Sequence, residues 1–318
     1  MSLSPLEPGT PIAPGYEVIA HLSRGRRLDV YDAWDGERGC RCVVKALRPE
    51  RLDDARARHA LLEEGRLLCR LAHPHLVRGY EVLTVPEPVV VMETLGGQTL
   101  GHMIEAGGPL GTEDAAQLGL QLGSAVRYLH ANGVLHLDLK PSNVVAEAGR
   151  ARLIDLSVAR PPGRARAGIG TWCYMAPEQA TGGSLGPAAD VWGIGAVLFE
   201  AAVGEAPFED PTGEGTDYAT ESSDLDTYTG PWPQLERPPA RVDELADVPV
   251  ALAEVVATCL RADPARRPDI ADVMVSLEPL TGMPPSEWRW LRARSSSRPR
   301  RTRSPASRDG QASPRSCA

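Results

Sequence analysis

The sequence predicts a two-lobed α+β fold, with a small N-terminal β-sheet lobe that carries one long helix and a larger, mainly helical C-terminal lobe. Up to residue 95, short segments alternate polar and apolar side chains or run continuously apolar, as β-strands do. After residue 96, apolar side chains recur with helical spacing. The 318 residues are 42% hydrophobic, which is enough for such cores and too much for a disordered chain.

The N-terminal lobe is expected to contain four strands and one helix. Residues 16–22 alternate like a strand, and 89–92 form a continuous apolar run typical of a buried strand. Leucines with helical spacing end before Pro74, because proline stops a helix. The expected strands are 16–22, 30–34, 40–47 and 89–92, and the expected helix is 52–71.

The C-terminal lobe is expected to hold four helices. Residues 115–130 are amphipathic, whereas 191–203 are apolar nearly all round and predict a buried helix. Two further helices are expected at 250–260 and 270–277. Residues 209–226 contain seven acidic residues and no basic one, which favours a solvated loop.

We divide the chain into a Pro-rich leader at 1–15, one domain at 16–280 and an Arg/Ser/Pro-rich tail at 281–318. The two lobes of the domain are expected at about 16–95 and 96–280. The tail has no apolar periodicity and is expected to be disordered. Its arginines could contact the acidic loop of the same chain; a solvated tail without that contact is the alternative.

Composition excludes several classes of protein. The formal net charge is −8 and nine arginines lie beyond residue 286, so the remainder is more acidic still, which argues against a nucleic-acid partner. The six cysteines form no CxxC pair and no Cys/His group with zinc spacing, as expected of reduced cytoplasmic thiols. We expect a cytoplasmic protein without a membrane span, because residues 1–15 lack signal-peptide features and the longest apolar stretch is 192–199.

Lysine is rare in this chain. The 34 basic Lys and Arg residues include only two lysines, Lys45 and Lys140. In a chain so biased toward arginine, a retained lysine indicates a site that needs a compact ammonium, because a guanidinium fork does not replace it there. Both lysines are therefore candidate functional residues.

Several short segments occur in a fixed order. They are VVK at 43–45, Glu64 on the following helix, HLDLKPSN at 136–143, DLS at 155–157 and APE at 176–178. Each is weak alone, but this order and spacing are not expected by chance. Together they resemble protein kinases over about residues 16–280, and most closely bacterial serine/threonine kinases of the eukaryotic (Hanks) type.

The resemblance implies ATP and Mg²⁺ or Mn²⁺ as cofactors, and a role for each motif residue. Asp138 would orient the acceptor hydroxyl and take its proton, and Lys140 would contact the transferred phosphate. Lys45, oriented by Glu64, would hold the α- and β-phosphates. The metal ligands that the resemblance implies are Asn143 and Asp155.

The resemblance also implies a nucleotide pocket. Gly25 would lie in the loop over the phosphates, and the backbone from Glu93 to Leu95 would face adenine, after a gatekeeper at Met92. The side chains expected to sandwich adenine are Val30, Val43 and Val145. Ordinary core packing is the alternative for each of these valines.

A protein substrate is favoured by the Ala-Pro-Glu segment, which small-molecule kinases of related fold generally lack. Thr171, just before it, would contact Asp138 and Lys140. Glu178 needs a buried cation, since an unpaired buried charge is costly, and Arg267 stands at the position of the family's partner.

Three departures from the family pattern affect the expected activity. The glycine-rich loop keeps only Gly25, with Ser23 and Leu28 in the other glycine slots. Leu137 replaces the arginine that pairs with a phosphorylated activation-loop residue, and 158–170 contain no Ser, Thr or Tyr. The metal-binding triplet ends in serine instead of glycine. We therefore expect activity that does not depend on activation-loop phosphorylation.

The function expected is ATP-dependent transfer of the γ-phosphate to serine and threonine hydroxyls of proteins. A pseudokinase acting as a binding or scaffold module is one alternative, and a small-molecule phosphotransferase is another. Thr171 and the Ala-Pro-Glu segment argue against the small-molecule enzyme. Catalysis is favoured over the pseudokinase by retention of Lys45, Glu64, Asp138, Asn143 and Asp155.

Overall fold

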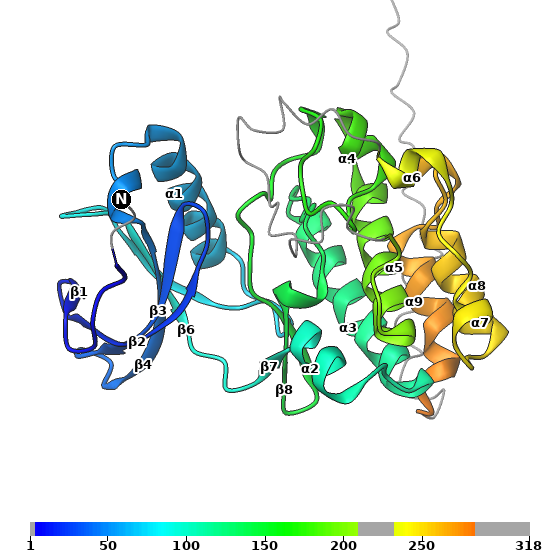
Figure 1. The fold of residues 1–318 in the computed structure, drawn as a ribbon, viewed down its shortest axis with the longest axis horizontal. Helices are drawn as coiled ribbons and strands as arrows, with labels where there is room; N and C mark the ends of the chain where they lie inside the picture. The colour runs from blue at the N-terminus through cyan, green and yellow to red at the C-terminus, as the bar shows by residue number, and fades with distance from the viewer. Residues whose placement is uncertain (1–3, 209–231, 284–318) are drawn as a thin grey trace, which may run out of the picture.

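The computed structural model describes residues 4–208 and 232–283 and has two lobes, which are joined after strand β6 (Val89–Glu93) (Figure 1). A sheet and one long helix form the first lobe, and helices dominate the second, which confirms the predicted fold class. The expected acidic loop at 209–226 and all but the first residues of the expected tail lie outside the described ranges. Within those ranges, no helix has the length and apolar character needed to cross a membrane.

An antiparallel six-stranded sheet forms the N-terminal lobe, in the order β1-β2-β3-β4-β6-β5. Strand β4 lies inside the sheet between β3 and β6, and its residues Cys42 and Val44 are fully buried. The remaining strands are β1 (Pro11–Ala13), β2 (Tyr16–Arg24), β3 (Leu28–Asp35), β4 (Cys40–Leu47) and β5 (Gly79–Leu83).

The sequence predicts four of these strands, β2, β3, β4 and β6, with ends within two residues. It does not predict β5, whose residues after the first are all half-buried and give no alternation. Strand β1 is also missed, because it has three residues and begins with proline. It pairs with β2, so the sheet extends into the segment assigned to the leader.

Helix α1 (Ala55–Arg70) packs against this sheet and places Glu64 on its buried side. It begins at 55 instead of 52, because the carboxylate of Asp54 caps it by accepting hydrogen bonds from two backbone N–H groups of the first turn. Gly79 of β5 lies close to the end of the helix, where an added Cβ would stand 2.8 Å from the backbone nitrogen of Cys69. The helix is therefore held tightly against the strands beside the lobe junction.

Helix α5 runs through the middle of the C-terminal lobe and packs against α3 and α8, as its apolar sequence predicts (Figure 1). The sequence also predicts α3, α8 and α9. It misses α4, α6 and α7, which have four or five residues and are too short to show helical periodicity, and it misses α2, which at eight residues is as long as α9. The helices are α2 (Leu100–Gly107), α3 (Thr112–Ala131), α4 (Pro177–Thr181), α5 (Pro187–Val203), α6 (Pro233–Glu236), α7 (Val242–Leu245), α8 (Val250–Cys259) and α9 (Ile270–Leu277).

Two small sheets position the loops of the site. Strands β7 (Gln98–Thr99), β8 (Val144–Glu147) and β9 (Arg150–Leu153) flank the loop at 136–143. Strand β10 (Gly163–Ala165) pairs with β11 (Gly183–Leu185) and holds the segment at 158–170 on the C-terminal lobe. The composition of β9, β10 and β11, rich in glycine, arginine and alanine, gives no strand signal.

Candidate active site

A buried aspartate anchors the loop at 136–143. Asp190 lies in the first turn of α5 and is 1% exposed. Its carboxylate accepts hydrogen bonds from the backbone N–H groups of His136, at 2.9 Å, and Leu137, at 2.7 Å. The partial positive charge of the helix N-terminus also favours a carboxylate at this place. The start of the loop is therefore fixed to the core of the C-terminal lobe.

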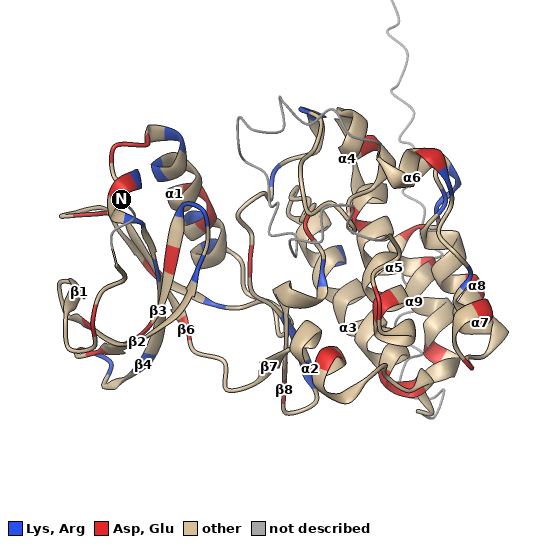
Figure 2. Ribbon diagram, in the orientation of Figure 1, with Lys and Arg blue, Asp and Glu red and all other residues tan. Residues whose placement is uncertain are grey.

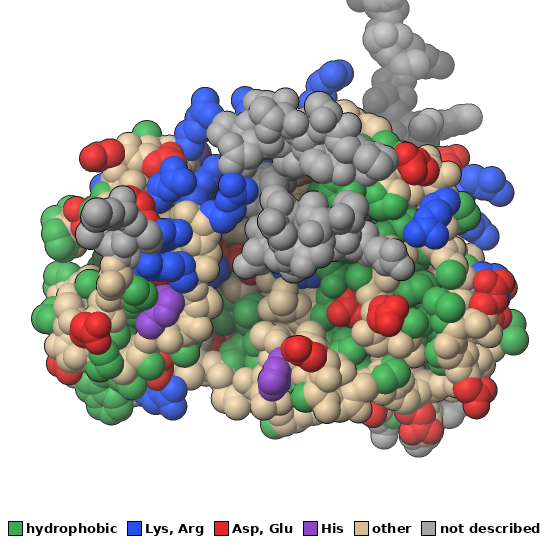
Figure 3. All heavy atoms as spheres, viewed as in Figure 1, with side chains coloured by type: hydrophobic (Ala, Val, Ile, Leu, Met, Phe, Trp, Pro, Cys, Tyr) green, Lys and Arg blue, Asp and Glu red, His purple; other side chains and the backbone are tan. Residues whose placement is uncertain are grey.

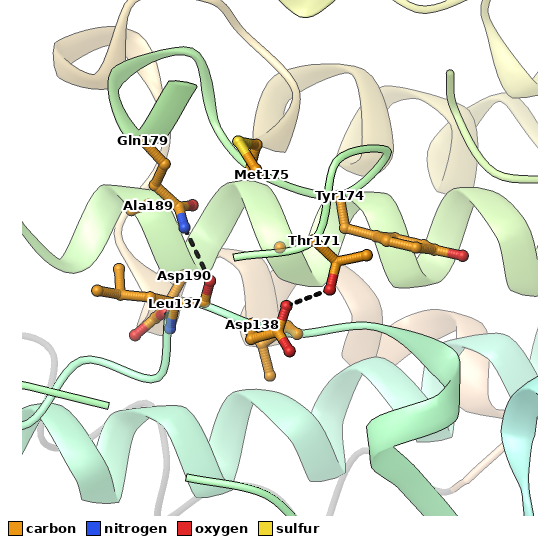
Figure 4. A pocket seen from close by; sticks show the side chains of 10 residues that line it. Leu137, Asp138, Thr171, Tyr174, Met175, Gln179, Ala189 and Asp190 are labelled. Carbon is orange, nitrogen blue, oxygen red and sulfur yellow. Dashed lines mark hydrogen bonds between the residues drawn. The ribbon is translucent and has the colours of Figure 1, made fainter. Parts of the chain in front are cut away.

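The predicted catalytic residues lie together on this loop and on the segment that crosses it. Thr171 donates its hydroxyl to Oδ1 of Asp138 at 2.6 Å (Figure 4). Lys140 Nζ donates to the threonine oxygen at 2.9 Å. Asn143 donates to Oδ2 of Asp138 at 3.0 Å. All four side chains are buried. The hydrogen bonds hold the aspartate in one orientation between an amide and a hydroxyl.

A second group of charges connects the lobes. Lys45 Nζ, on β4, donates to Oε1 of Glu64 on α1 at 2.5 Å and lies 3.6 Å from Oδ2 of Asp155. The same Glu64 oxygen accepts a hydrogen bond from the backbone of Leu156 at 3.4 Å. The helix, the strand and the Asp155 segment are therefore assembled around one ammonium group.

Burial and charge act in opposite directions on this group. Burial opposes the charge of Lys45, but the carboxylates of Asp155 and Glu64 outweigh it and raise the lysine pKa. Burial raises the pKa of Glu64 to about 7, against the attraction of Lys45. Burial also opposes the charge of Asp155, but Lys45 and the backbone N–H of Ser157 lower its pKa to about 2. Asp155 therefore keeps its charge at neutral pH, and Glu64 is the carboxyl that protonates first.

The predicted metal ligands meet the requirements of a hard cation. Asp155 supplies carboxylate oxygens and keeps 29% of its side chain exposed. Asn143 supplies an amide oxygen, and its backbone carbonyl accepts from Ile154 N–H at 3.1 Å, next to Asp155 in the chain. Mg²⁺ prefers such oxygen ligands, and it commonly completes its shell with substrate phosphates and waters. The residues present therefore fit the implied metal.

Strand register places three predicted nucleotide-site residues on one face of the N-terminal sheet. Val30 of β3 is directly opposite Lys45 of β4, so their side chains share a face. Val43 lies two residues before Lys45 and points the same way. Val145 lies on β8 of the other lobe and is 7% exposed. The structure thus puts two of the valines beside the lysine and the third across the lobe junction.

The segment expected to contact adenine follows β6. Met92 is buried, and Leu95 is half-buried against the main core. The carboxylate of Glu93 accepts the backbone N–H of Arg78 at 2.7 Å and contacts the guanidinium of Arg152 on β9. This ion pair ties the end of the N-terminal sheet to the C-terminal lobe. The sequence gives no signal for it, because the two residues are far apart in the chain.

Ion pairs close the β2–β3 hairpin, where the resemblance predicts the glycine-rich loop. Gly25 N–H donates to the Leu28 carbonyl at 2.8 Å, so Gly25 lies in the turn between β2 and β3. The guanidinium of Arg24 forms two hydrogen bonds to Asp29, at 2.7 and 2.8 Å, and His21 lies 3.0 Å from the same carboxylate. Figure 2 shows basic residues along this turn, and Figure 3 shows Lys and Arg side chains gathered where this lobe faces the other.

A buried ion pair fixes the end of the activation segment, the stretch from the DLS motif at 155–157 to the APE motif at 176–178. Arg267 donates to both carboxylate oxygens of Glu178, at 2.6 and 2.8 Å, in the fork geometry typical of arginine. The guanidinium also donates to three backbone carbonyls and lies 5.0 Å from the ring centroid of Trp192. The expected partner of Glu178 is thus in contact with it.

Residues 16–276 match the protein kinase domain family. The chain belongs to that family. Its curated relatives include a probable serine/threonine-protein kinase, PkwA, of Thermomonospora curvata, which is 32% identical over 86% of this chain and 35% of its own length. Serine/threonine-protein kinase PknD of Mycobacterium tuberculosis is 30% identical over 79% of this chain and 37% of its own length.

A third relative is the DNA damage-responsive serine/threonine-protein kinase RqkA of Deinococcus radiodurans, 35% identical over 64% of this chain and 32% of its own length. The chain therefore spans about a third of the length of these relatives. Their names and the family match confirm the resemblance to bacterial serine/threonine kinases that the sequence predicts.

Two residues of the kinase site have no counterpart in the sequence analysis. Asp29 is 1% exposed at the start of β3, and its contacts with Arg24 across the hairpin and with His21 explain a carboxylate there. Gln179 is 2% exposed and directly follows the Ala-Pro-Glu segment. A polar residue on a short helix gives no sequence signal of a functional role. Both act through partners that only the folded chain brings near.

Proposed function

We propose that this chain is an ATP-dependent serine/threonine protein kinase, using Mg²⁺ or Mn²⁺, that works without activation-loop phosphorylation. The observation that carries the proposal is the joint assembly of two groups: Lys45 with Glu64 and Asp155, and Asp138 with Lys140 and Thr171. Phosphoryl transfer depends mainly on positioning and charge neutralisation, and these two groups supply both.

Each group has a distinct task in the proposed reaction. Lys45, held by Glu64, binds the nucleotide phosphates, and Asp155 with Asn143 holds the metal. The bound metal supplies charge neutralisation around the phosphates. Asp138 orients a substrate serine or threonine hydroxyl and takes its proton as the oxygen bonds to the γ-phosphorus. The bond from that phosphorus to the β–γ bridging oxygen breaks, and ADP leaves.

The activation segment supports a protein as the substrate. Strand β10 pairs with β11, the Glu178–Arg267 pair fixes the end of the segment, and Trp172 stacks on Trp232 with ring centroids 4.5 Å apart. The segment is thus held on the C-terminal lobe beside Asp138, where an extended peptide could lie.

Independence from activation-loop phosphorylation is supported by the residues around the loop. Residues 158–170 contain no hydroxyl side chain, and Leu137 offers no cation to a phosphate. Thr171 directly follows this stretch, but it is 1% exposed and bonded to Asp138 and Lys140. Phosphatase treatment should leave the transfer rate unchanged, and loss of the rate would contradict this part of the proposal.

One observation favours the alternative of a pseudokinase that acts as a binding module. The Arg24–Asp29 pair closes the β2–β3 hairpin with side chains where the family has glycines that let the backbone approach phosphates. Labelled ATP with a generic basic protein substrate separates the two functions, when wild type is compared with Asp138→Asn. Equal labelling by both proteins would favour the binding module.

A further inference from the structure

The side-chain amide of Gln179 forms hydrogen bonds to the backbone of three segments, through both N–H groups and the oxygen. Its Nε2 group donates to the Leu137 carbonyl at 2.8 Å (Figure 4). It also donates to the Ile169 carbonyl at 2.7 Å. Its Oε1 accepts the backbone N–H of Ala176 at 3.0 Å. Gln179 therefore links the catalytic loop, the activation segment and the start of α4 through one buried side chain.

These segments approach one another as closely as backbones can. Leu137 has a left-handed φ of 66°, which is unfavourable for a bulky residue. Gly170 has a φ of 114°, and an added Cβ would lie 2.6 Å from the Leu137 carbonyl oxygen and 3.0 Å from Nε2 of Gln179. An amide NH₂ group between the two carbonyls satisfies both of them, whereas an apolar side chain would leave them buried without that partner.

The two carbonyls belong to residues that lie just before Asp138 and Thr171 in the chain. Leu137 precedes Asp138 directly, and Ile169 lies two residues before Thr171. The amide of Gln179 therefore sets how the Thr171 segment lies against Asp138, where their side chains meet at 2.6 Å. In kinases that pair a phosphorylated activation loop with an arginine, that contact joins the same two segments. Here Leu137 supplies no arginine, and the neutral amide of Gln179 joins the two segments beside the Thr171 contacts with Asp138 and Lys140.

We propose that Gln179 is a positioning residue of the transfer reaction, which holds the activation segment on the catalytic loop in place of a phosphate–arginine contact. This inference rests on the proposed kinase function. It assigns Gln179 to the acceptor side of the site only, because Lys45, Glu64 and Asp155 share no hydrogen bond with it among the described residues. The variants should therefore impair turnover of a protein acceptor and leave nucleotide binding intact.

The test replaces Gln179 with methionine, which has similar length and makes none of these hydrogen bonds. Gln121→Met is the matched control, because Gln121 also bonds two backbone groups, Ala151 N–H and the Gly149 carbonyl, away from the site. We expect kcat with a protein substrate to fall about 100-fold in Gln179→Met, since misplacement of reacting groups by about 1 Å costs that much. KM for ATP and the thermal shift caused by Mg-ATP should match wild type.

The outcomes separate the inference from the function beneath it. If wild type transfers phosphate in an Asp138-dependent way and Gln179→Met retains kcat within twofold, the inference is wrong and the function stands. If wild type shows no Asp138-dependent transfer, both are overturned. If Gln179→Met does not fold, Gln179→Glu decides, because it keeps the acceptor for Ala176 and loses both donors. A normal kcat in that variant, or an equal loss in Gln121→Met, would also overturn the inference.

Discussion

Replacing Arg267 with methionine removes the cation from a carboxylate that has little access to water. The Arg267 side chain is fully buried, and Glu178 is 16% exposed, so the glutamate would face the protein interior without its partner. Removing one member of a buried ion pair costs about 3–5 kcal/mol. The contact with Trp192 adds about 1 kcal/mol, and three backbone carbonyls lose a donor. We expect a total loss of at least about 4 kcal/mol, the low end of the pair's cost plus the Trp192 contact.

Urea unfolding followed by tryptophan fluorescence measures this loss, with circular dichroism as a second probe of the same transition. A cost of about 4 kcal/mol lowers the melting temperature of a domain this large by about 10 °C. The double variant Glu178→Met with Arg267→Met should cost clearly less than the sum of its single variants, because it leaves no charge unpaired. A cost below about 1 kcal/mol for Arg267→Met, or strict additivity, would refute the reasoning.

Four further predictions concern the pKa of Glu64, which affects activity and stability, the packing of Gly97 and the activation segment. Transfer activity should fall as the pH drops through about 7, because protonation of Glu64 weakens its pairing with Lys45. Glu64→Gln should be less active, and its pH–rate profile should lack this fall on the acid side. The same fall in the variant would contradict the assignment to Glu64. The folded-state pKa of Glu64, about 7, lies above its ordinary value of 4.5. Its contribution to stability is therefore fully present below pH 4.5 and is lost as the pH rises through about 7. Urea unfolding should show that the stability of Glu64→Gln rises relative to wild type from about pH 5 to about pH 8. Gly97→Ala would place a Cβ 1.9 Å from the Ala146 carbonyl oxygen and should cost about 3 kcal/mol in urea, whereas Gly96→Ala, with its nearest atom at 3.4 Å, should cost under about 1 kcal/mol; equal costs would refute the packing argument. Phosphatase-treated wild type should keep its transfer rate within about twofold, measured with labelled ATP, because residues 158–170 contain no hydroxyl side chain to phosphorylate.

Much of the fold is predictable because its longer elements carry their own periodicity. Strand β4 and helix α9 begin and end where the sequence predicts, since each has alternating or helical burial along its length. Strands β10 and β11 are not predictable in this way. They contain three residues each, and they form only because the fold brings 163–165 and 183–185 together, with Arg164 paired with Ser184.

The residues of the candidate site also fall into a predictable group and an unpredictable one. Lys45, Asp138 and Asp155 belong to short motifs whose residues are neighbours in the chain, so their grouping can be inferred before the fold is known. The roles of Asp29 and Gln179 depend on partners that the fold supplies: an arginine across a hairpin, and carbonyls up to 42 residues away. Buried polar side chains that satisfy backbone groups of other segments have no sequence signature.

The central claim is that the assembled charges at Lys45 and Asp138 catalyse phosphoryl transfer to protein hydroxyls. The most direct measurement is incorporation of label from γ-labelled ATP into serine and threonine of a basic protein substrate, with Mg²⁺ present, by wild type and by Asp138→Asn. We predict incorporation by wild type that falls at least ~100-fold in the variant, in which a neutral amide cannot accept the proton. Equal incorporation by the two proteins, or none by wild type with either Mg²⁺ or Mn²⁺, would contradict the claim.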